Sequence, residues 1–100
     1  MTAPANRLPP IHPGEVLAEE LETLGLSARA FAAAIKVPHN RISAILRGQR
    51  ALTADTALRL ERFLGTSAKF WMNLQQTYEL KIAEQERGAQ IRRDVQARVA

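Results

Sequence analysis

The sequence contains no cysteine, which excludes a disulfide framework and a thiolate metal site. It has no apolar run near the roughly 20 residues that a membrane-spanning helix needs. Its first residues also lack the pattern of a secretory signal peptide. We therefore expect a soluble, cytoplasmic protein that has no membrane partner. At 100 residues, the chain is long enough for one domain with a modest core.

The side chains that enzymes use for catalysis are scarce. The two histidines, His12 and His39, have no companions at metal-ligand spacing. No glycine-rich loop is present to cradle a phosphate group, and the adjacent Glu19 and Glu20 face different ways on a helix. We therefore predict that the protein is not an enzyme and that it uses neither a metal ion nor a cofactor.

The formal net charge of +4 conceals a separation of charge along the chain. Residues 12–26 contain no Lys or Arg and hold four glutamates: Glu15, Glu19, Glu20 and Glu22. Residues 27–50, called the basic segment below, contain no Asp or Glu and hold five cations: Arg29, Lys36, Arg41, Arg47 and Arg50. A surface of one positive sign suits the binding of nucleic-acid phosphates through counterion release. Chance clustering in a basic protein is the alternative.

The apolar residues of the basic segment predict two short helices joined by a tight turn. Phe31 and Ile35 lie one helical turn apart, and Ile42 and Ile45 lie three apart on a second helix. Val37 falls between the two helices, where a buried side chain would hold the turn in place. This is the packing pattern of a helix-turn-helix motif.

We expect the second helix of this pair to start at Pro38, to end at Gly48 and to present its polar side chains to the major groove of DNA. In that groove Asn reads adenine, Arg reads guanine or holds phosphate, and Ser can hydrogen-bond either way. With the neighbouring cations, the predicted DNA-binding residues are Arg29, Lys36, His39, Asn40, Arg41, Ser43, Arg47 and Arg50. An ordinary solvated helix pair is the alternative interpretation.

Three further helices complete the predicted fold, which is all-α: a compact five-helix bundle with a long C-terminal helix. Glycines at positions 25, 48 and 65 each fall where a helix must end. The first helix is expected over Pro13–Leu24, with an inner stripe of Leu17, Leu21 and Leu24.

Polar caps mark where the other helices begin. Ser27 precedes a short helix over residues 28–35, and Thr53 precedes a fourth helix. The buried stripe of that fourth helix is predicted to be Ala57, Leu60 and Leu64.

Ser67 opens the long fifth helix, along which Trp71, Leu74, Tyr78 and Ile82 recur at helical spacing. This face either packs on its own domain or meets the same face of a second subunit. Helix-turn-helix repressors act as dimers because two half-sites lie about one DNA turn apart. We therefore expect a homodimer, and the predicted interface residues are Phe70, Trp71, Leu74 and Tyr78.

The two ends of the chain differ from its middle. Residues 1–10 are rich in Pro and Ala and predict a flexible N-terminal arm. Residues 11–82 form the predicted helix-turn-helix domain with its dimerisation helix. Residues 83–100 are polar and predict a C-terminal helical extension, in which Gly88 is a candidate interruption.

Two longer stretches carry a family resemblance. The basic segment resembles the helix-turn-helix of the phage-repressor (Xre/Cro-like) superfamily. HPGEVLAEEL and RISAILRGQRALTADTALRLERFLGTSAKFWMNLQQTYEL are similar to HigA-type antitoxins of bacterial toxin–antitoxin modules, and this resemblance covers residues 11–82. Lys36 departs from the pattern, because such motifs commonly have Gly at this turn position, where φ is positive.

The resemblance implies a dimeric antitoxin with two partners. One is a cognate toxin protein, typically a small basic ribonuclease of the RelE-like fold that cleaves mRNA. The other is the double-stranded operator DNA of its own operon, which it represses. Two alternatives remain open from the sequence: a stand-alone transcriptional repressor without a toxin, and an interaction module that no longer binds DNA.

Overall fold

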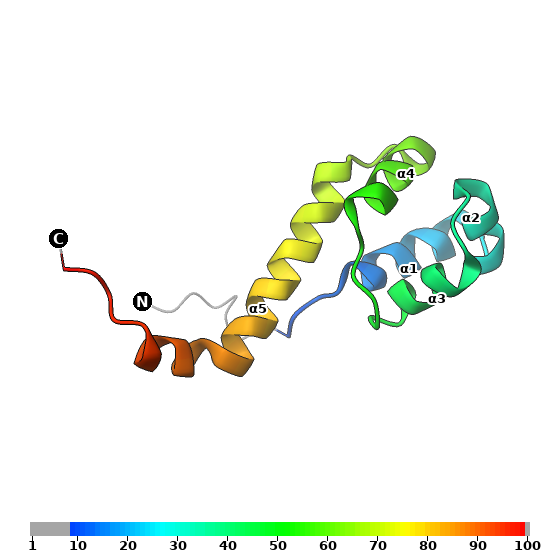
Figure 1. Ribbon diagram of the computed structural model, residues 1–100. Helices are drawn as coiled ribbons and strands as arrows, with labels where there is room; N and C mark the ends of the chain where they lie inside the picture. The colour runs from blue at the N-terminus through cyan, green and yellow to red at the C-terminus, as the bar shows by residue number, and fades with distance from the viewer. Residues whose placement is uncertain (1–8, 100) are drawn as a thin grey trace.

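The computed structural model describes residues 9–99, so most of the predicted arm at residues 1–10 lies outside the described residues. The described residues form helices and no strand, which confirms the all-α prediction. In chain order the helices are α1 (Pro13–Leu24), α2 (Ala28–Ile35), α3 (His39–Leu46), α4 (Ala54–Leu64) and α5 (Ala68–Asp94). Figure 1 shows α1 to α4 together at one end, with the last part of α5 standing away from them. None of these helices is long and apolar enough to cross a membrane.

Local signals in the sequence set most of the helix boundaries. Ser27, Thr53 and Ser67 each have extended backbone, and each side chain accepts a hydrogen bond from a main-chain N–H in the first turn of the following helix. Gly25 and Gly65 end α1 and α4 in the left-handed conformation, with φ of 70° and 87°. These boundaries confirm the predicted caps.

The helix α3 is shorter than the sequence predicted. Pro38 precedes it as the N-cap with an extended ψ of 139°, so the first helical residue is His39. The helix ends at Leu46, before Gly48, which has a φ of 73° in the following turn. The prediction of a helix running from Pro38 was therefore wrong by one residue, because ψ at Pro38 is not helical.

Each of residues 12–15 (His-Pro-Gly-Glu) has a structural role at the start of α1. The Nδ1 atom of His12 accepts a hydrogen bond from the N–H of Gly14 at 2.9 Å, and Oε2 of Glu15 accepts one from the N–H of His12 at 3.3 Å. Pro13 occupies the first helical position. Gly14 lies so close to Ile45 of α3 that any Cβ there would overlap the Ile45 carbonyl oxygen.

One core unites all five helices. The buried apolar side chains are Leu17, Leu21, Phe31, Ala32, Ile35, Val37, Ile42, Ile45, Leu52, Ala57, Leu60 and Trp71. Two predicted stripe residues differ. Leu24 is 51% exposed because it lies at the end of α1, beyond the elements that cover Leu17 and Leu21, and Leu64 is only half-buried.

The fifth helix is continuous for 27 residues, so Gly88 does not interrupt it. Gly88 is buried beneath the side chain of Glu84, whose carboxylate forms an ion pair with Arg92 at 2.9 Å. Any side chain at position 88 would displace that carboxylate. Figure 1 shows the ribbon of α5 changing direction in its orange segment, and the molecule extends to 53 Å along its longest axis.

A buried glutamine, which no sequence pattern indicated, connects α5 to the rest of the domain. Oε1 of Gln75 accepts a hydrogen bond from the N–H of Leu52 at 2.8 Å, and its Nε2 donates to Glu79 at 2.8 Å. Leu52 lies in the connection between α3 and α4. The helix α5 is therefore tied directly to the chain that follows α3.

Candidate nucleic-acid interface

The outward face of α3 is polar because its inward face is occupied by two isoleucines. Ile42 and Ile45 are both fully buried. Successive residues of an α-helix are about 100° apart, so Asn40 and Arg47 lie opposite the two isoleucines, and Ser43 and His39 lie beside them toward the Ile42 flank. Asn40 and Arg47 are exposed, while His39 and Ser43 are half-buried. The structure thus brings four predicted DNA-binding residues onto one face.

Two hydrogen bonds connect side chains of this region to their neighbours. The hydroxyl of Ser43 lies 3.3 Å from Nε2 of His39, one helical turn earlier. The Nε–H of Arg47 donates to the side-chain oxygen of Gln49 at 3.3 Å. The side chain of Asn40 has no such bond among the described residues, so its amide is available to an external partner.

Arg41 does not share this face. It lies about 200° around the helix from His39, on the flank next to Ile45. Its side chain is half-buried, and its Nε is buried with no hydrogen-bond partner in the part of the chain described. Arg41 is thus separated from the other polar residues of α3.

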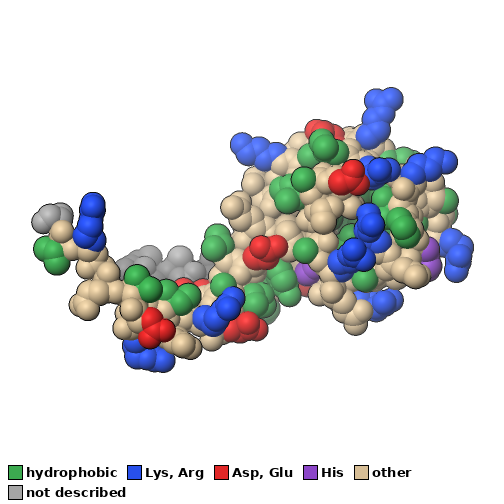
Figure 2. All heavy atoms as spheres, viewed as in Figure 1, with side chains coloured by type: hydrophobic (Ala, Val, Ile, Leu, Met, Phe, Trp, Pro, Cys, Tyr) green, Lys and Arg blue, Asp and Glu red, His purple; other side chains and the backbone are tan. Residues whose placement is uncertain are grey.

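The remaining predicted cations surround α3 in the chain. Arg29 lies in the first turn of α2, Lys36 in the turn before α3, and Arg50 in the loop after it, and all three are exposed. Figure 2 shows Lys and Arg side chains gathered over the end of the molecule that holds α2, α3 and α4. A helix with a polar outer face can lie in the major groove of duplex DNA, and the cations around it can bind the phosphates.

The turn between α2 and α3 has a positive φ at Lys36, the position where the resembling motifs commonly have Gly. Lys36 adopts φ 61° and ψ 45°, a left-handed conformation that costs a non-glycine residue about 1–2 kcal/mol. Val37 follows it, is buried, and donates its N–H to the Ala32 carbonyl at 3.0 Å. Lys36 therefore closes the turn in the geometry that glycine would adopt.

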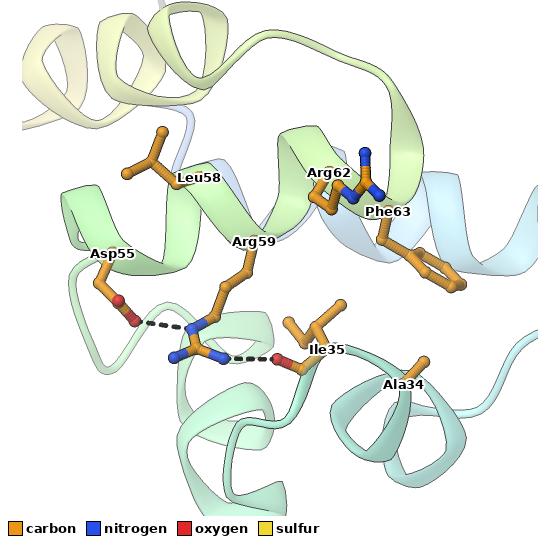
Figure 3. A pocket seen from close by; sticks show the side chains of 7 residues that line it. All are labelled: Ala34, Ile35, Asp55, Leu58, Arg59, Arg62 and Phe63. Atoms are coloured by element: carbon orange, nitrogen blue, oxygen red, sulfur yellow. Dashed lines mark hydrogen bonds and ion pairs between the residues drawn. The ribbon is translucent and has the colours of Figure 1, made fainter.

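An arginine from α4 binds this turn, as Figure 3 shows. The Nη1 of Arg59 donates to the carbonyl oxygens of Ile35 at 2.9 Å and Lys36 at 3.4 Å, and its Nε donates to Asp55 at 2.8 Å. Arg59 was not among the predicted site residues. The spacing of Asp55 and Arg59 indicates an ion pair on a helix, but no pattern in the sequence indicates a bond to residues 23 or 24 positions away.

His12 contacts three parts of the molecule: the start of α1, helix α5 and the loop after α3. Its ring packs edge-on against Tyr78 of α5, with centroids 4.9 Å apart, and lies against Gly48 in the loop after α3. Burial lowers the pKa of His12, while a hydrogen bond to the Arg50 backbone and the charge of Glu15 act in the opposite direction. A neutral ring is what the helix cap needs, since Nδ1 must accept the N–H of Gly14.

The predicted interface residues of α5 have different environments. Trp71 is 1% exposed within a single chain, so it belongs to the core and has no surface left for a second subunit. Phe70 is 40% exposed, and Leu74 and Tyr78 are half-buried. Phe70 and Leu74 line a shallow hollow of about 330 Å³ together with Ile11.

Among the described residues, no group of three or more His, Asp or Glu side chains is placed to hold a metal ion.

Comparison with known proteins places these features in a family. A helix-turn-helix family model matches residues 17–71, which include α2, α3 and α4. Virulence-associated protein I of Dichelobacter nodosus is 53% identical over 90 residues, covering 87% of this chain and 83% of the relative.

Two solved structures are similar along nearly their whole length. An addiction module antidote protein of the HigA family from Coxiella burnetii is 49% identical, with a TM-score of 0.88, and the match covers 91% of this chain and 100% of that one. The Pseudomonas aeruginosa antitoxin HigA, solved with the higBA promoter, is 44% identical, with a TM-score of 0.87, over 90% of this chain and 99% of that one.

Proposed function

The chain belongs to the HigA-type antitoxins of the helix-turn-helix family, and from that premise we propose that it represses its own operon as a dimer and neutralises a cognate toxin. Members of this family are DNA-binding regulators and antitoxins rather than enzymes. The proposed site of action is the cytoplasm, where the operon and the toxin are both present.

The polar face of α3 carries the DNA-binding half of the proposal. His39, Asn40 and Ser43 enter the major groove and read base edges, since they share the polar face in the first part of the helix, with Asn40 opposite the buried isoleucines. The similar HigA of P. aeruginosa, solved with promoter DNA, supports this assignment. Phosphate or guanine contacts are assigned to the exposed cations Arg29, Lys36, Arg47 and Arg50. Arg41, on the flank of α3, is assigned a phosphate contact only.

The exposed part of the predicted α5 face carries the dimer. Phe70, Leu74 and Tyr78 offer apolar surface to a second subunit, whereas Trp71 supports them from the core. A two-fold dimer places two α3 helices on successive half-sites of the operator. In this proposal, residues 11–82 bind DNA and dimerise, and residues 83–100 extend the helical surface.

The toxin-binding half follows from membership of the antitoxin family, and it has a direct test. The test expresses any small open reading frame adjacent to this gene in bacteria, with and without this chain. We expect growth arrest by the small protein alone, rescue by co-expression, and co-purification of a stable complex.

The alternative function is a stand-alone repressor that uses the same DNA surface. It predicts binding to the operator in a mobility-shift assay together with no toxicity and no complex for the product of either flanking gene. A chain that rescues growth but does not bind its own promoter would instead contradict the repressor half.

A further inference from the structure

We propose that the toxin docks on the hollow between the end of α1 and the end of α4, and that its contacting segment combines an apolar side chain with a Lys or Arg. This inference rests on the proposed function, because it names the surface through which the antitoxin binds its protein partner. It concerns a different part of the molecule from α3.

The hollow is apolar at its base and open to solvent. It has a volume of about 320 Å³ and is lined by Glu20, Leu24, Leu26, Phe63 and Leu64. Leu24 and Phe63 are 51% and 44% exposed, although both are large apolar side chains. A hollow of this size, with two such side chains at its surface, accommodates an apolar side chain of a partner.

The floor of the hollow is held firmly by the core. The ring of Phe63 packs edge-on against the fully buried Phe31, with centroids 5.7 Å apart. Leu26 and Leu64 are half-buried and pack against the same core. The site is thus formed before a partner arrives, which lowers the entropic cost of binding.

The charge around the hollow is negative on the α1 side. All charged residues of α1 are glutamates, and none of them forms an ion pair with another described residue. Glu20 lines the hollow itself. The last turn of α1 contains no Lys or Arg, although the negative end of the helix dipole favours cations there. A Lys or Arg of the partner supplies the missing positive charge.

The hollow lies outside the surfaces assigned to the other two interactions. Its residues come from α1, α4 and the residue that follows Gly25, whereas the DNA face comes from α3 and its flanking turns. The proposed dimer residues Phe70, Leu74 and Tyr78 all lie on α5. The three proposed interactions therefore use different residues of the chain.

The test is a substitution that places a positive charge in the hollow without disturbing the core. Leu24→Lys removes a side chain that is already half exposed and puts a cation at the C-terminal end of α1, where the dipole favours it. The partner is the small protein whose toxicity this chain suppresses in the growth test, and its affinity for this chain is measured by calorimetry or by titrated co-purification. We expect the affinity to fall at least tenfold, growth rescue to weaken, and operator binding to stay within about twofold of the wild type.

Two further variants make the result specific. Val95→Lys introduces the same charge at an apolar side chain that is 66% exposed beyond the end of α5, and we expect it to bind the toxin as the wild type does. Glu20→Lys provides a second change in the hollow, and we expect the same loss as for Leu24→Lys. Equal loss in Val95→Lys would mean that added charge alone weakens the complex, which overturns the docking site.

The possible failures are distinguishable. If the wild type rescues growth and both hollow variants bind the toxin with unchanged affinity, the docking surface is wrong and the antitoxin function stands. If the wild type neither rescues growth nor forms a complex, the proposed function fails, and the inference fails with it.

Discussion

Arg59 of α4 donates a hydrogen bond to the main-chain carbonyl oxygen of Ile35, the last residue of α2, at 2.9 Å. The same nitrogen reaches the carbonyl of Lys36, the residue with left-handed backbone in the turn. The α4 helix thus binds the carbonyl groups that the end of α2 leaves without helical partners. Because α3 follows this turn directly, Arg59 connects the segment before α3 to α4.

Replacing Arg59 with Met is expected to weaken operator binding several-fold without changing its dependence on salt. The variant loses the hydrogen bonds to the turn, which contribute about 1 kcal/mol at a partly exposed side chain. Fluorescence anisotropy at several salt concentrations measures both quantities. Arg62→Met is the control, because this exposed arginine of the same helix has no hydrogen bond or ion pair to the described residues. A salt slope reduced by about 1 for Arg59→Met would indicate a phosphate contact instead.

Substitutions at and near the polar face of α3 are expected to have two different effects on DNA binding. Asn40→Ala and Ser43→Ala should change which operator bases are preferred, each at a cost of about 1–3 kcal/mol. Arg47→Ala and Arg50→Ala should weaken binding to all sequences and lower the salt slope. Competition binding with single-base operator variants separates the two classes. Wild-type behaviour of all four variants would contradict the assignment of α3 as the recognition helix.

Replacing Gly14 with Ala is expected to destabilise the fold, although alanine normally favours a helix. The added Cβ would overlap the carbonyl oxygen of Ile45, so α1 and α3 must move apart. We expect a loss of about 1–3 kcal/mol in the free energy of unfolding, measured by urea denaturation. If only helix propensity mattered, the same change would stabilise the protein by up to about 1 kcal/mol, so the sign of the effect decides.

Stability should decrease in mildly acidic solution because of His12. Burial lowers the pKa of this histidine below its ordinary value of about 6.5, so the unfolded chain binds the proton more readily. The contribution of neutral His12 is therefore complete above about pH 6.5 and is lost as the pH falls through the lower pKa of the folded state. Protonation also removes the Nδ1 acceptor for the N–H of Gly14.

The matched variant for this effect is His12→Asn. Asparagine is a good N-cap but does not titrate, so the difference in stability between pH 7 and pH 5 should become smaller. Thermal unfolding at both pH values gives the comparison. A wild-type pH dependence in the variant would assign the effect to the carboxylates rather than to His12.

Substitutions of the neighbouring aromatic residues Phe70 and Trp71 of α5 are expected to have different effects, because their burial differs. Phe70→Ser should lower the dimer fraction in sedimentation while leaving the monomer folded, because Phe70 is 40% exposed. Trp71→Ala should instead lower the free energy of unfolding by about 3–5 kcal/mol, because Trp71 is almost completely buried. If Phe70→Ser and Leu74→Ser both remain fully dimeric, the interface lies elsewhere on the chain.

Most helix boundaries and the polar face of α3 could be predicted from the sequence. Capping residues, left-handed glycines and helical periodicity are local signals, and they located α1 and α2 to the residue. Alternating buried and polar positions placed Ile42 and Ile45 inward and Asn40 outward, because a helix has a fixed period. The positive φ at Lys36 was expected from the resemblance to helix-turn-helix motifs, which commonly have Gly at this position.

The contacts between these helices could not be predicted from the sequence, because they depend on how the helices pack. The hydrogen bonds of Arg59 to the α2 turn and of Gln75 to Leu52 join residues more than 20 positions apart. The contact of Gly14 with Ile45 likewise depends on how α1 crosses α3. Whether Trp71 lies in the core or on the surface, and whether Leu24 is covered, also depended on neighbouring elements. Periodicity defines a face of one helix, but only the packing of several helices defines what covers that face.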